Sequence, residues 1–204
     1  MPSQSLVVGY HGCDRRLVEK VVAGVEVLKP SQNARDLLGH GIYFWEDSHA
    51  RAMRWAEAES ERRRSSITAP AVLGAIIQLG NFLNLMETEA LSLVKSAHVS
   101  YLSACASTGS PAATNRGPEL RARFLDCAVI QTLHQLRREQ GKAEFDTVRG
   151  FNRIRVIQPR MDLACQSRNQ RSAAASAQAP QAFTIADTKV RPRWATEHVC
   201  ETLC

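Results

Sequence analysis

Two short stretches near the start of the chain hold residues that could contact a small polar ligand. The first is Tyr10-His11-Gly12-Cys13, and the second is Gly39-His40-Gly41-Ile42-Tyr43-Phe44. Glycine lets main-chain groups approach a flat amide closely, a tyrosine ring can stack on a planar cation, and a neutral histidine can hydrogen-bond to a ribose hydroxyl. Together these groups suit a nucleotide with a positively charged aromatic base, and the nicotinamide of NAD+ is such a base.

The same residues also have a purely structural interpretation. A histidine at a strand end is often a structural residue, and Tyr43, Phe44 and Trp45 suit an ordinary buried strand. Side chains alternate along a strand, so Tyr43 and Trp45 should lie on one face and Phe44 on the other. Glu46 and Asp47 are typical of a helix start, where the helix dipole favours acidic residues.

The sequence gives little support for other kinds of nucleotide-binding or metal-binding site. No Gly-x-Gly-x-x-Gly fingerprint follows a predicted strand, and no P-loop is present. The six cysteines are scattered. Cys200 and Cys204 lie beside His198, but no second cluster completes the four ligands that zinc usually takes. We therefore expect free thiols and no metal. We interpret Asp126 and Arg149 as a structural ion pair, with support of the ligand site as the alternative.

The composition is that of an ordinary globular domain. The chain has 204 residues, 44% of them hydrophobic and 23% charged. No apolar run approaches the roughly 20 residues that span a bilayer, and the N-terminus does not resemble a signal peptide. We expect a cytoplasmic protein with no membrane partner. The net charge is +6, and the run Arg62-Arg63-Arg64 is typical of a solvated face, with a nucleic-acid patch as the alternative.

The hydrophobic pattern predicts mixed helices and strands without a regular β-α-β rhythm, so the expected fold class is α+β. Asp14 should cap the first helix and Gly24 should end it. Further helices are expected at 49–63, 88–106 and 118–140, and strands at 5–11, 41–45, 71–79, 145–150 and 153–158. Beyond Pro159 the character of the sequence changes, and residues 172–183 are low in complexity. We expect one domain over residues 1–158 and a poorly ordered tail over residues 159–204.

The two glycine-rich stretches together resemble motifs of the ADP-ribosyltransferase superfamily of the poly(ADP-ribose) polymerase and diphtheria-toxin type. That superfamily has a His-Tyr-Glu triad, with the histidine in an HG strand end and the tyrosine in a GxGxYF strand. A closer similarity is to a group of bacterial proteins with this fold. It covers residues 6–150 and includes three further segments, which read Pro30-Ser31-Gln32-Asn33, LDCAVI at 125–130 and FDTVRG at 145–150.

The resemblance implies a split, mostly antiparallel sheet clasped by helices, with NAD+ bound as co-substrate between strands. It implies that His11 binds the adenosine ribose, that the Gly12 main chain holds the nicotinamide carboxamide, and that Tyr43 stacks on the nicotinamide. Ser31, Asn33 and Gly41 would complete the cofactor site. The structural interpretation of Ser31 and Asn33, which the residues alone favour, is that they cap a turn. The implied activity is mono-ADP-ribosyl transfer to a protein or a nucleic acid, in a toxin-like bacterial setting that leaves room for an antitoxin or inhibitor partner.

The third catalytic residue is where this chain departs from the family. Gln158 follows Val156-Ile157 and would take that place, but the spacing is short and Pro159 follows directly. No similarity extends downstream. Two other interpretations therefore stay open: a catalytically defective NAD-binding or interaction module of the same fold, and a basic nucleic-acid-binding protein.

Overall fold

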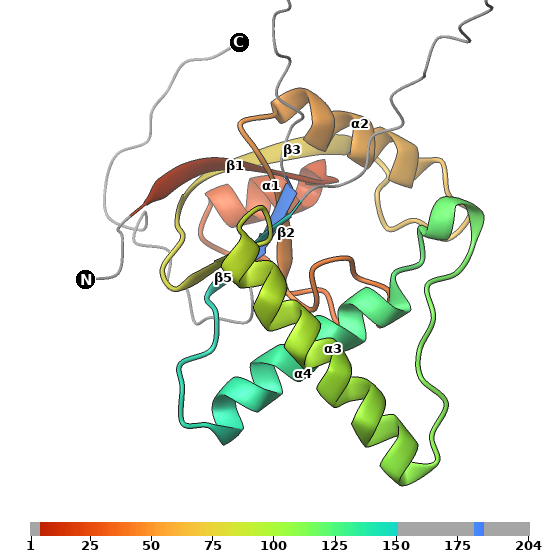
Figure 1. The fold of residues 1–204 in the computed structure, drawn as a ribbon. Coiled ribbons are helices and arrows are strands. Elements are labelled where there is room, and N and C mark those ends of the chain that lie inside the picture. The colour runs from red at the N-terminus through yellow and green to blue at the C-terminus, as the bar shows by residue number, and fades with distance from the viewer. Residues whose placement is uncertain (1–4, 151–181, 186–204) are drawn as a thin grey trace, which may run out of the picture.

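A computed structural model describes residues 5–150 and 182–185, which include six strands joined in one sheet (Figure 1). The strand order is β3-β1-β2-β6-β5-β4. Neighbouring strands are antiparallel except β4 and β5, which are parallel. The strands are β1 (Leu6–Asp14), β2 (Ile42–Glu46), β3 (Pro70–Gln78), β4 (Phe82–Asn84), β5 (Thr147–Gly150) and β6 (Ala182–Ile185).

Four α-helices accompany the sheet in the described part of the chain. They are α1 (Arg15–Val22), α2 (His49–Ser60), α3 (Thr88–Thr108) and α4 (Phe124–Glu139). Helix α2 contacts β1 and β3, whereas α3 and α4 cross and pack against each other (Figure 1). This mixture of elements confirms the α+β class. None of the described helices is long and apolar enough to span a membrane.

Side chains of β2 pack into two separate hydrophobic cores. Phe44 is buried with Ile77 and Leu79, whereas Tyr43 packs against a larger cluster that includes Leu38 and Val148. The predicted alternation along this strand is therefore confirmed. The larger cluster also takes up the facing sides of α3 and α4, so it joins the helix pair to the sheet.

The helix expected at 118–140 begins only at Phe124. Pro118–Leu120 form a separate 3₁₀ turn, in which Glu119 and Leu120 have a φ of 55°. The reason for the late start is Asn115, whose side-chain oxygen accepts a hydrogen bond from the Leu125 amide at 2.9 Å. Asn115 thus satisfies an amide at the start of the helix from outside it, as a capping residue does.

Two strands were not predicted from the sequence. β4 follows Gly80-Asn81, where we expected only a turn, and β6 lies inside the tail 159–204, where no strand was expected. β6 pairs with β2 on one side and with β5 on the other. The strand predicted at 153–158, and Gln158 within it, lie outside the described residues.

Candidate functional site

His11 lies near the C-terminal end of β1, and its side chain is hydrogen-bonded to the main chain of Tyr43. The Nδ1 atom of His11 lies 2.7 Å from the Tyr43 carbonyl oxygen. A carbonyl can only accept, so Nδ1 carries the hydrogen and Nε2 is the unprotonated nitrogen of the neutral ring. Burial lowers the pKa of His11, with a smaller opposing effect from this hydrogen bond, and favours that neutral form.

The Tyr43 side chain is held by the loop that precedes its own strand. Its hydroxyl donates to the Gly39 carbonyl oxygen at 2.6 Å and accepts from the Leu38 amide at 3.0 Å. The pairing of Tyr10 with Trp45 places His11 opposite Phe44, and the His11 and Phe44 rings lie 5.6 Å apart between centroids. Because opposite residues share a face, the His11 and Tyr43 side chains leave the sheet on different faces.

Ser31, Asn33 and Gly41 come together in the loop before β2. The main chains of Ser31 and Gly41 exchange two hydrogen bonds, of 2.8 and 3.0 Å. The Asn33 side-chain amide donates to the Ser31 hydroxyl at 2.9 Å. These contacts fit the structural interpretation of the two polar side chains, since each satisfies the other.

Gly12 is required by the close approach of α2. A Cβ atom at this position would overlap the Ala52 carbonyl oxygen and lie 3.1 Å from the Trp55 ring. The sequence suggested that a ligand approaches this glycine. In the described chain a helix does so, and it places the Trp55 indole next to the end of β1.

A pocket of about 440 Å³ opens at this end of β1. Its volume falls within the range of small-molecule sites. Tyr43, Ser31, Asn33 and Gly41 do not line it, so only two of the predicted cofactor residues reach it. The residues that could contact a ligand there include His11, Gly12, Arg16, Lys20, Trp55 and Thr68.

Sequence reasoning missed Arg16, Lys20 and Trp55. Arg16 and Lys20 are four residues apart in a helix that starts directly after the His11-Gly12 strand end, a spacing that places both on one helix face. That spacing was a readable signal. Trp55 could not be placed in this way, because its position depends on how α2 packs on Gly12.

Asp14 lines the pocket and connects α1 to the loop after α2 through hydrogen bonds. Its carboxylate accepts hydrogen bonds from the Thr68 amide at 2.7 Å, the Thr68 hydroxyl at 2.9 Å and the Ala69 amide at 3.0 Å. The Arg16 amide donates at 3.0 Å, so the predicted N-cap is confirmed. These donors, with the Ala69 amide foremost, hold the pKa of Asp14 well below its usual range.

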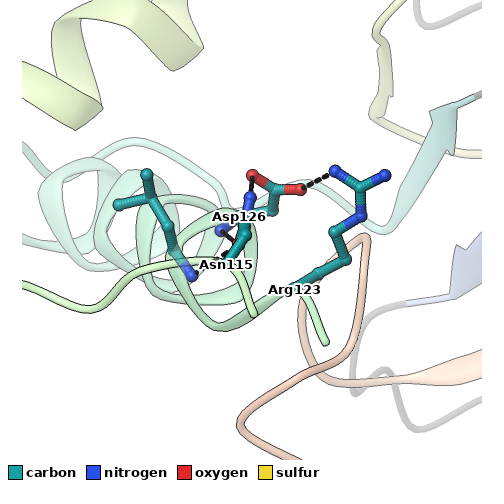
Figure 2. A network of polar contacts seen from close by, with 4 residues as sticks. Asn115, Arg123 and Asp126 are labelled. Carbon is teal, nitrogen blue, oxygen red and sulfur yellow. Dashed lines mark hydrogen bonds and ion pairs between the residues drawn. The ribbon is translucent and has the colours of Figure 1, made fainter. Parts of the chain in front are cut away.

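Arg149 and Asp126 do not pair with each other, which corrects the ion pair suggested above. Arg149 lies 2.6 Å from Glu46, and both side chains are largely buried. Asp126 instead contacts Asn115 at 2.9 Å and Arg123 at 3.4 Å (Figure 2). Glu46 is thus the last residue of β2 with a partner in β5, and the expectation that it starts a helix was wrong. Burial raises the pKa of Glu46, although Arg149 opposes this.

The described residues include free cysteines but no cluster of metal ligands. Within residues 5–150 and 182–185, no three His, Cys, Asp or Glu side chains gather in a way that could hold a metal ion. Cys13, Cys105 and Cys127 are free thiols. Burial, with a smaller effect of Asp14, raises the pKa of Cys13 to about 11, so this thiol stays protonated beside the pocket.

Comparison with known proteins adds one partial likeness. The chain is 42% identical over 55 residues to the uncharacterized protein MJ0359 of Methanocaldococcus jannaschii, which is 26% of this chain and 25% of that protein. The match therefore spans about a quarter of that relative. No protein-family pattern matches the chain, and no solved structure matches it.

Proposed function

We propose that this protein binds NAD+ at the pocket beside the end of β1 and transfers its ADP-ribosyl group to a protein or nucleic-acid acceptor. The observation that carries the proposal is the placement of His11. The Tyr43 carbonyl fixes the position of the imidazole hydrogen on Nδ1, and burial favours the neutral ring. His11 also borders a pocket that has an indole and two cationic side chains.

Each lining group matches one part of the dinucleotide. The Trp55 ring offers a π-face to the cationic nicotinamide. Arg16 and Lys20 offer positive charge to the pyrophosphate. The unprotonated Nε2 of His11 can accept a hydrogen bond from a ribose hydroxyl. Tyr43 supports the site from behind, because its carbonyl holds the imidazole and its hydroxyl holds the loop before β2.

The proposed reaction breaks the bond between the ribose C1′ atom and the nicotinamide nitrogen. Both bonding electrons stay with nicotinamide, which leaves as a neutral molecule, and the ribose carbon becomes electron-poor. A lone pair of the acceptor then forms the new bond to C1′, and the acceptor loses its proton to water or a base. The protein contributes mainly by holding the reactants in position.

The test is NAD+ turnover by the full chain. We expect release of nicotinamide and transfer of labelled ADP-ribose, both reduced at least about tenfold in His11→Ala and Trp55→Ala, the loss that follows from about 1.4 kcal/mol of transition-state binding. Leu91→Ala on α3, far from the pocket, is the matched control and should keep wild-type activity. Turnover that is equal in the wild type and both pocket variants would contradict the proposal.

A second candidate is NAD+ binding without turnover. It is favoured by the state of the two carboxylates at the pocket: Asp14 is occupied by four hydrogen bonds, and Glu26 is paired with Lys20 at 3.3 Å. Asp14 is therefore not free to hold a ribose hydroxyl or to activate an acceptor, and Glu26 becomes free only when Lys20 leaves it to bind the pyrophosphate. Calorimetric binding of NAD+ that weakens in Trp55→Ala, with no nicotinamide release by the wild type, would select this candidate.

A further inference from the structure

The outer edge of β3 has no pairing partner among the described residues, because β3 ends the strand order. This edge is nine residues long and reads PAVLGAIIQ, without one charged side chain. Edge strands of soluble proteins usually carry lysines, bulges or a covering element that prevent further pairing. A long, uncharged edge is therefore suited to bind another strand.

The register shows which residues of β3 offer hydrogen bonds to a new strand. The Leu79 amide donates to the Ser5 carbonyl, and the register continues through Val7 with Ile77 and Gly9 with Ala75. In an antiparallel pair, successive residues turn their N–H and C=O groups alternately toward and away from the neighbour. Val72, Gly74 and Ile76 consequently direct these groups outward, away from β1.

These outward residues are symmetric about Gly74, the centre of the strand. If a second copy of β3 pairs antiparallel around Gly74, Val72 of each copy lies opposite Ile76 of the other. Only Pro70, at the strand start, lacks an amide to donate. The apolar pairs on both sides of the centre contain no charges, so two identical edges meet without repulsion.

An exposed apolar surface lies on the same face as these residues. The Ile76 side chain is 74% exposed and lies on the same face of the sheet as that of its β1 partner Val8, which is 41% exposed. Leu6, the next residue of β1 whose side chain lies on this face, is 64% exposed. These three side chains form one patch at the free end of β1 and β3. A second copy placed around Gly74 would bring its own Val72 toward this patch.

We propose that two copies of this chain associate through antiparallel pairing of their β3 edges about a two-fold axis at Gly74. This interface uses the same strand from both subunits, which is the usual arrangement of a two-fold dimer. It joins two six-stranded sheets into one continuous sheet. The proposal does not depend on NAD+ or on the pocket.

The first experiment measures the molar mass of the full chain by light scattering at concentrations up to about 100 µM, a range that reveals weak dimers of small interface area. We expect about twice the 22.6 kDa of one chain. Ile76→Lys should halve this mass, because it places a charge at each Val72–Ile76 pair. Val99→Lys, at a residue of α3 that is 62% exposed, should leave it unchanged. A monomeric wild type, or equal behaviour of the two variants, would overturn the proposal.

The second experiment locates the axis by cross-linking. A Cβ atom at Gly74 would lie 3.5 Å from the Tyr10 ring, an ordinary contact, so Gly74→Cys should fold normally. Residues paired at the axis have Cα atoms about 5.5 Å apart, within reach of a disulfide. Mild oxidation should give a covalent dimer of Gly74→Cys well above the level in the wild type and in Val99→Cys. Cross-linking no stronger than in those two controls would exclude this register.

Discussion

Gly12 and Tyr43 lie at the two places where the candidate site joins the rest of the fold. Gly12 leaves room for the Ala52 carbonyl of α2, and Tyr43 ties the loop before β2 to the strand itself. Both were predicted from the sequence as ligand-contacting residues. Their observed contacts are with other parts of the chain, which gives each of them a structural role that can be measured without any ligand.

Gly12→Ala should destabilise the fold. The added methyl group must displace the backbone of α2, a form of overpacking that costs about 1–3 kcal/mol. Urea unfolding should show a lower midpoint. The matched control is Gly74→Ala, whose methyl group meets only the edge of the Tyr10 ring at an ordinary distance. If both variants unfold at the wild-type midpoint, α2 does not lie as close to β1 as described.

Tyr43→Phe should lower the free energy of unfolding by about 1–3 kcal/mol, because the Gly39 carbonyl and the Leu38 amide lose their partner in a part-buried place. Thermal unfolding followed by circular dichroism is the measurement. Tyr10→Phe is the control, since the structure shows no hydrogen bond of the Tyr10 hydroxyl to a described residue. A Tyr43→Phe variant as stable as the control would show that these two hydrogen bonds contribute nothing.

Among the elements, those with a local signal could be predicted and those that depend on distant partners could not. Asp14 was a predictable N-cap because the capping residue directly precedes its helix. The start of α4 was misjudged because Pro118 resembles a first-turn proline, whereas the residue that satisfies the first amides is Asn115, in the preceding loop. β4 and β6 are short strands whose neighbours lie far away in sequence, so pairing rather than pattern defines them.

The hydrogen bonds of Asp14 between α1 and the start of β3 should make the stability of the fold depend on pH in the acid range. Its pKa is low in the folded state and ordinary, about 3.9, in the unfolded chain. The stabilising contribution is therefore complete above about pH 4 and is lost as the pH falls further. Asp14→Ala should unfold at a lower temperature at neutral pH and depend less on pH between about 5 and 2 than the wild type. Leu91→Ala on α3, which removes no titrating group, should keep the wild-type pH profile, and an equally steep profile for Asp14→Ala would contradict this assignment.

The order of the strands in the sheet is the feature of the whole molecule that depends most on contacts between distant parts of the sequence. The fold class could be predicted from the mixture of helical and strand patterns, but the order could not, because no local pattern places β6 between β2 and β5. The candidate site, likewise, could be predicted from the sequence only in part. His11 and Gly12 were identified from their motif, while the side chains around them depend on how α1, α2 and the loop before β3 meet.

Two truncations test the central position of β6. A chain that ends at Gln181 lacks the strand that joins β2 to β5, so its sheet is divided. We expect its melting temperature to fall by more than about 10 °C, or its unfolding to lose cooperativity, since several kcal/mol of pairing and burial are removed. A chain that ends at Ile185 keeps every described strand and should melt close to the full chain. Equal melting of the two truncations would show that β6 contributes no stability.

The place of β6 also has a consequence during synthesis. When translation has reached Gly150, β2 and β5 have already been made, and each has an edge without its neighbour. Such open edges attract other chains, and the exposure lasts until residues 182–185 leave the ribosome exit tunnel. This interval is when the nascent protein most needs a chaperone, and slower elongation between codons 150 and 185 should lower the yield of correctly folded protein.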